Sequence, residues 1–152
     1  MKTRSLSALS IFAFALTMSA QWSAPQQDIP AYHDAAPKKT ATLKPILKPE
    51  TLNLPQSPSL DAQRKAYLVA AKIPGVLYQQ PCFCHCDRHF GHDSLRGCFT
   101  DEHGAHCGTC LAEALYAYRM TKQGKTPKEI RAGIMRGDFQ SLDLQKLDDI
   151  KF

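Results

Sequence analysis

The six residues PCFCHC, numbered Pro81 to Cys86, place three cysteines on alternate positions of the chain. The other three cysteines are Cys98, Cys107 and Cys110. All six cysteines and five of the six histidines therefore fall between positions 82 and 110. A small domain seldom buries enough apolar surface to fold alone, so this concentration predicts a covalent or metal-held centre. Disulfide bonding, metal ligation and thiol exchange are the chemistries that it allows.

Residues 1–20 have the plan of a secretory signal peptide. Lys2 and Arg4 precede a short apolar stretch, and small residues close it at Ser19 and Ala20. This stretch is shorter than the roughly 20 apolar residues of a membrane span. An uncleaved N-terminal anchor is the alternative. The sequence therefore predicts an exported protein, periplasmic or extracellular, with no membrane span after signal cleavage and in a compartment where disulfides persist.

The disulfide interpretation follows from this compartment and from the even number of cysteines. In an extended strand, Cys82, Cys84 and Cys86 would point to one face at a spacing of about 7 Å, which is beyond disulfide reach. Each would need a partner among the three later cysteines. The result would be a disulfide-stapled module that presents a surface to an extracytoplasmic protein partner, and the histidines would have no role in it.

The metal interpretation uses the crowding of the thiols directly. Cys-x-Cys and Cys-x-x-Cys are spacings at which two sulfurs grip one soft ion. The second pair, Cys107 and Cys110, falls on the first turn of an expected helix, where the helix N-terminus favours the thiolate. Ordinary burial on the apolar face of that helix is the alternative for this pair. The predicted metal ligands are Cys82, Cys84, Cys86, Cys98, His103, Cys107 and Cys110.

Within this set, Cys84 and Cys86 are expected to act with Cys107 and Cys110 as the central thiolates. Cys82 and Cys98 are expected either to pair as a disulfide or to add ligands. The preferred ion is copper(I), because thiolate-rich Cys-x-Cys sites suit it, and zinc is second. The predicted role is carriage, storage or structural use of the metal.

Catalysis is less expected than binding. The sequence shows no paired carboxylates, activated serine or phosphate-cradling loop. A thiol oxidoreductase using Cys107 and Cys110 is a third interpretation, but the preceding residues FTDEHGAH are polar and do not read as a strand. Nucleic acid is not an expected partner, because the formal net charge is only +5 and no basic stripe is interleaved with aromatic residues.

Proline density divides the chain after the signal peptide. Residues 21–57 are rich in proline and carry scattered apolar residues, which predicts a flexible, disordered linker with His33 as a solvated residue. A mainly α domain of three to four short helices around an irregular cysteine loop is expected over 58–137. One helix is expected from a cap at Ser57 and a first residue at Pro58 to Ile73, with an apolar stripe of Ala62, Ala66, Val69, Ala70 and Ile73. The others are expected over PGVLYQQ, from Ala105 to Lys122 and from a capping box at Thr126 to Gly137. A C-terminal tail is expected over 138–152, docked as a short helix.

Three blocks in order, IPGVLYQQPCFCHC, GHDSLRGCF and HGAHCGTCLAEALYAYRMTKQGKTPKEIRAGI, resemble the bacterial PCYCGC-motif proteins. The resemblance covers about Ile73 to Ile134 and implies an extracytoplasmic protein, in many members a lipoprotein. The chain departs from the motif twice. His85 stands where the motif has glycine, which adds a possible ligand, and the cysteine that would carry a lipid is missing. The resemblance supports the domain boundary and export, and it leaves the chemistry open.

Overall fold

The computed structural model describes residues 28–39, 43–54 and 60–152. The predicted signal peptide, 1–20, and the expected cap at Ser57 lie outside these residues. Every regular element of the described part is a helix and none is a strand, so the predicted mainly α class is confirmed. No helix among the described residues is long and apolar enough to cross a membrane.

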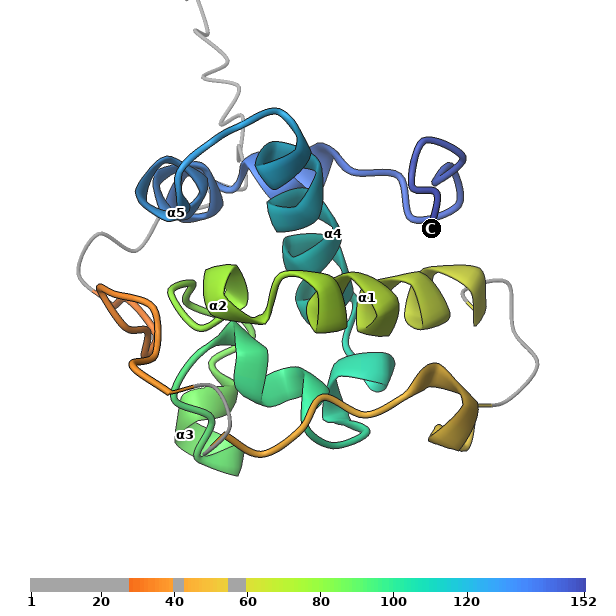
Figure 1. Ribbon diagram of the computed structural model, residues 1–152, viewed down its shortest axis with the longest axis horizontal. Helices are drawn as coiled ribbons and strands as arrows, with labels where there is room; N and C mark the ends of the chain where they lie inside the picture. Colours follow the sequence, from red (N-terminus) through yellow and green to blue (C-terminus); the bar gives the residue numbers. More distant parts are fainter. Residues whose placement is uncertain (1–27, 40–42, 55–59) are drawn as a thin grey trace, which may run out of the picture.

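Two helices, α1 (Leu60–Lys72) and α4 (Gly108–Lys122), pack against each other and form the centre of the core. They cross at a steep angle (Figure 1). The predicted apolar stripe of α1 is buried throughout, because Ala62, Ala66, Val69 and Ala70 all have no exposed surface. Small side chains on this face let the two helix backbones approach closely. Leu115 of α4 is equally buried.

Two further helices also follow the sequence. Helix α2 (Pro74–Leu77) forms the expected short second helix. Helix α5 (Pro127–Arg136) starts at the predicted capping box, in which Thr126 Oγ1 accepts the Glu129 N–H at 3.3 Å and the Glu129 side chain accepts the Thr126 N–H at 2.8 Å. It ends at Gly137, whose positive φ of 82° permits the left-handed turn.

The cysteine region is more regular than the irregular loop that was expected. It contains helix α3 (Cys86–Phe90) and the 3-10 helices η3 (Leu95–Phe99) and η4 (His103–His106). The expected start of the long helix at Ala105 is wrong, because Ala105 belongs to η4 and α4 begins at Gly108. Residue Gly104 permits this arrangement, since a Cβ there would lie 2.5 Å from the Cys98 carbonyl oxygen.

The structure differs from the expected flexible linker over 28–39 and 43–54. In the second stretch, which contains η2 (Pro49–Thr51), the Leu47 N–H donates to the Phe99 carbonyl at 2.9 Å. In the first, the His33 ring stacks on Tyr78 with centroids 3.8 Å apart. Proline prevents a helix but leaves an extended chain free to pack its scattered apolar residues. The partly buried ones are Ile46, Leu47, Leu52 and Leu54.

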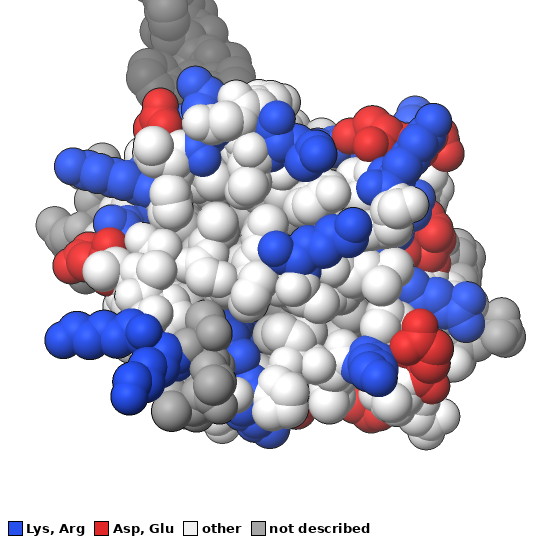
Figure 2. All heavy atoms as spheres, in the orientation of Figure 1, with Lys and Arg blue, Asp and Glu red and all other residues white. Residues whose placement is uncertain are grey.

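The tail contains a short helix, but it is of the 3-10 type, and the chain beyond it docks through apolar side chains. After the 3-10 helix η5 (Asp138–Ser141), residues 142–152 contain only turns and extended chain. Leu147 and Ile150 are nevertheless almost fully buried. On the face in Figure 2, basic and acidic side chains are interspersed around a largely uncharged centre and do not form one basic patch.

Candidate metal centre

The six cysteine thiols converge on one place and are all free. The Sγ of Cys82 lies 3.4 Å from the Sγ atoms of both Cys84 and Cys110, and these two lie 3.5 Å apart. The Sγ atoms of Cys86 and Cys98 are 3.2 Å apart. A disulfide bond is about 2.05 Å long, so the sulfurs are in contact but not bonded. Two sulfurs on one tetrahedral zinc ion lie about 3.8 Å apart, which is close to these separations.

A tight turn gathers the first three cysteines. The extended conformation against which the disulfide interpretation was weighed does not occur here, because the His85 N–H donates to the Cys82 carbonyl at 3.0 Å and His85 has a left-handed φ of 56°. The Sγ atoms of Cys82, Cys84 and Cys86 therefore lie within 4.8 Å of one another. The left-handed conformation explains a glycine at this position, because other residues adopt it at a cost.

The remaining ligand candidates come from three other elements. Cys98 lies on η3 and is fully buried, and His103 begins η4. Cys107 is the N-cap of α4, and Cys110 lies in the first turn of that helix, as the sequence predicted. The structure thus places all seven predicted residues around one cluster.

One part of the cluster is a group of three thiols and one imidazole, formed by Cys84, His103, Cys107 and Cys110. Their candidate ligand atoms all lie within 4.8 Å of one another, and His103 Nε2 is 3.7 Å from Cys84 Sγ. Three thiolates and one imidazole form a common tetrahedral zinc set. The expected central set was Cys84, Cys86, Cys107 and Cys110, and the structure groups three of these four thiols but has His103 in place of Cys86.

The other part contains His92, which the sequence suggested to be a polar loop residue and which is not among the seven predicted ligands. It groups with Cys86, Cys98 and His103 within 4.8 Å. Its Nε2 lies 3.2 Å from Asp101 Oδ2, whereas its Nδ1 is buried and without a hydrogen-bond partner. Its spacing from the cysteines carries no recognisable signal. Gly97 makes room for it, since a Cβ at that glycine would lie 2.9 Å from His92 Cβ.

The crowding of the thiols lowers the pKa of some of them and raises the pKa of others. Contact with Cys107 and then Cys110 lowers the pKa of Cys84, and contact with Cys110 and then Cys82 lowers the pKa of Cys86 to about 3. The pKa of Cys110 is raised, and contact with Cys107 is the largest cause. Cys84 and Cys86 are therefore the thiols most readily present as thiolates, the form that ligates metals.

A buried carboxyl group, that of Glu113 on α4, forms a hydrogen bond to the turn that carries the first three cysteines. Its Oε1 accepts the Phe83 N–H at 2.9 Å, and its Oε2 is buried without a partner. Burial raises the pKa of Glu113 well above its usual value, which favours the neutral form. Glu113 stands one turn after Cys110 on the inward face of α4, so an acidic residue in an apolar stripe was the signal that could have revealed it.

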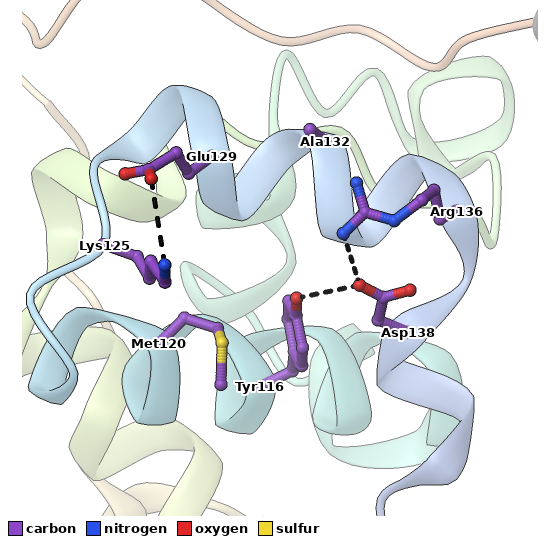
Figure 3. A pocket seen from close by; sticks show the side chains of 7 residues that line it. All are labelled: Tyr116, Met120, Lys125, Glu129, Ala132, Arg136 and Asp138. Atoms are coloured by element: carbon purple, nitrogen blue, oxygen red, sulfur yellow. Dashed lines mark hydrogen bonds and ion pairs between the residues drawn. The ribbon is translucent and has the colours of Figure 1, made fainter.

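Other parts of the molecule offer less to a metal ion. The side chains of His89 and His106 are exposed and belong to none of the cysteine groups. A hollow of about 340 Å³ lies between α4 and α5 (Figure 3). Its charged groups pair with one another, Arg136 with Asp138 at 2.6 Å and Lys125 with Glu129 at 3.9 Å. The cysteine cluster is therefore the candidate functional site.

Comparison with known proteins bears on the family and not on the chemistry. A family model described as "Protein of unknown function with PCYCGC motif" matches residues 50–139, which include every cysteine of the cluster. No curated protein and no solved structure matches the chain. Because the match spans more than half of the sequence and the resemblance seen in its motifs agrees with it, the chain belongs to the PCYCGC family.

Proposed function

We propose that this chain is a small exported metal-binding protein that holds a soft or borderline metal ion through its Cys/His cluster. The observation that carries the proposal is the convergence of six free thiols with two imidazoles. Thiolates packed this closely repel one another, and a cation relieves that repulsion while satisfying several sulfurs at once. Carriage, storage or structural use of the ion is the corresponding role.

Copper(I) is the preferred ion and zinc the second. Six thiols exceed what one tetrahedral ion uses, and sulfurs 3.2 to 3.5 Å apart suit a thiolate-rich site of the kind that binds copper(I). The group of three thiols and one imidazole suits zinc. A copper(I) site outside the cytoplasm must resist oxidation, and the burial of Cys82, Cys86, Cys98 and Cys110 supports this.

Export is part of the same proposal. It rests on the signal-peptide plan of residues 1–20, and it puts the cluster in a compartment without a reducing thiol pool. The ligands that we propose are the seven predicted from the sequence, with His92 added.

A disulfide-stapled interaction module is the second candidate, and one distance favours it. The Sγ atoms of Cys86 and Cys98 lie 3.2 Å apart, so a small shift would bring them to bonding distance. A thiol oxidoreductase has less support. Cys110 has no exposed surface, and the described residues contain no strand to precede a thioredoxin-like motif.

Mass spectrometry of the protein purified from the periplasm, under native and then denaturing conditions, tests the proposal. We expect metal in the native mass and unpaired thiols in the denatured mass. The Cys107→Ser/Cys110→Ser double variant should lose the ion that these two thiols bind, whereas His106→Ala, which alters an exposed histidine outside the cluster, should keep its full metal content. Full metal occupancy in the double variant would reject the site. Disulfide-linked masses without metal would favour the stapled module.

A further inference from the structure

The two parts of the cluster differ in their access to solvent and in the groups behind them. We propose that the cluster holds two ions in separate positions, an outer ion that exchanges and an inner ion that is retained. We also assign Asp101 the role of positioning His92 as a ligand of the inner ion. This inference rests on the proposed function and deepens it.

The outer position is the group of Cys84, His103, Cys107 and Cys110. Three of these four side chains are partly exposed, and Cys110 alone is fully buried. His103 belongs to this position because its Nε2 lies 3.7 Å from Cys84 Sγ. An incoming chelator or partner can reach Cys84, His103 and Cys107 without unfolding the domain, so an ion held here can leave by stepwise ligand exchange.

The inner position is formed by Cys86, Cys98 and His92, whose side chains are 2%, 0% and 8% exposed. Asp101 Oδ2 lies 3.2 Å from His92 Nε2, which makes that nitrogen the N–H donor and leaves the lone pair on Nδ1. Nδ1 is buried and has no partner among the described residues. A buried nitrogen lone pair without a partner is costly, and ligation of a metal ion is the interaction that would satisfy it.

The carboxylate of Asp101 contacts one histidine of each position, so a substitution there can show how the two positions differ. Its Oδ1 accepts the His103 backbone N–H at 2.9 Å, and its Oδ2 holds His92. A carboxylate behind a metal-bound imidazole fixes the tautomer and raises the basicity of the ligand. Asparagine at position 101 would keep an acceptor for the His103 N–H but remove the negative charge behind His92.

Cys82 lies between the two positions and completes the inner one. Its Sγ is 3.4 Å from the Sγ atoms of Cys84 and Cys110 on the outer side. It is also within 4.8 Å of the Sγ atoms of Cys86 and Cys98 on the inner side. With Cys82 as the fourth inner ligand, the six thiols and two imidazoles divide into two sets of three sulfurs and one nitrogen, and no cysteine is left over.

Cadmium loading of the reduced full-length chain tests this division, because Cd²⁺ is soft and binds where thiolates are available. We expect two ions per chain in native mass spectrometry and two phases of release to an excess of chelator. The faster phase should be lost in Cys107→Ser and the slower in His92→Ala. Asp101→Asn should still bind both ions, but its affinity for the inner ion should fall by roughly 10–100-fold. His106→Ala should behave as the unaltered protein.

The outcomes separate this inference from the proposed function. A chain that binds no ion contradicts the proposed function itself. One ion per chain, or release of all ions in a single phase, leaves the proposed function standing and overturns the two positions. Two ions in a folded His92→Ala variant would overturn the inner assignment. If that variant does not fold, the release kinetics of the unaltered protein and of Asp101→Asn test the two positions instead. An unchanged slow phase in Asp101→Asn would overturn the role of Asp101.

Discussion

The helical frame of α1, α4 and α5 and the cysteine segment, residues 81–107, have interiors of different kinds. The frame is filled with hydrocarbon, for example Leu115 and Ile134, whose burial is favourable without any bound group. The cysteine segment also buries Leu95 and Phe99, but beside them it encloses thiols, His92 and Arg96. Buried polar groups are favourable only when they are paired, so we expect the frame to hold together by itself and the segment to need a cation or a covalent bridge.

The two regions share helix α4 but use different positions of it, so mutations on this helix can separate them. On α4, Leu115 packs in the apolar core, whereas Cys110 and Glu113 contact the cysteine segment. A change at one set of positions should therefore affect one region first.

The largest expected effect is that of metal removal. A chelator without reductant should lower the melting temperature and expose the cysteine segment, because structural zinc contributes on the order of 10 kcal/mol in small domains. In hydrogen exchange, the Leu95 N–H, which donates to the Gln80 carbonyl at 2.8 Å, should lose protection before the amides of α5. Reductant alone should leave the metal-held protein intact. The opposite pattern, sensitivity to reductant and not to chelator, would identify disulfides.

A smaller loss is expected from Leu115→Ala, which opens a cavity in the frame. The free energy of unfolding should fall by about 2–5 kcal/mol, as measured by chemical denaturation. The number of bound ions in the folded variant should not change, because the Leu115 side chain offers no ligand atom. Loss of metal from a variant that is still folded would show that the two regions are not separable.

At the junction, Glu113→Ala should destabilise the protein by about 1–3 kcal/mol, because the buried Phe83 N–H loses its acceptor. Glu113→Gln is the matched control, because glutamine has the same shape and its amide oxygen can still accept the Phe83 N–H. Denaturation of both variants, with and without bound metal, measures the coupling. Equal losses in the two variants would show that the carboxyl group itself, rather than an acceptor at that point, is required.

The smallest effect concerns the turn within PCFCHC. His85→Gly should leave metal binding unchanged and alter the free energy of unfolding by less than about 1 kcal/mol, because glycine accepts the left-handed conformation but loses more entropy on folding. Gly91→Ala provides the comparison, since Gly91 has a φ of 67° and open space around it. That variant should be destabilised by about 1 kcal/mol. Reduced metal occupancy in His85→Gly would make His85 a ligand.

Local patterns in the sequence predicted the frame. The alanine stripe of α1 and the capping box at Thr126 both depend on residues within a turn or two, and both are confirmed. The candidate ligands were recognised by residue type, and the structure brings all seven together. What the sequence did not reveal depends on partners distant in the chain or on backbone conformation.

His92 is the clearest of these cases. It reaches the cluster only because η3 and η4 fold against each other, with Gly97 leaving room and Asp101 holding the ring. The packing of residues 28–39 and 43–54 was missed for a similar reason. Proline content describes which backbone conformations are allowed, but the contacts of His33 with Tyr78 and of Leu47 with Phe99 are made with the domain itself.

The contact between Cys82 and Cys110 joins positions 28 residues apart, and it has a consequence for the order in which the site assembles. A chain exported N-terminus first delivers PCFCHC to the oxidising compartment before α4 arrives there. During that interval its thiols have no helix to shield them and no second pair to share an ion. The arrival of α4 closes the cluster, so we expect the speed of helix docking, rather than the affinity of the finished site, to determine how many nascent chains escape oxidation.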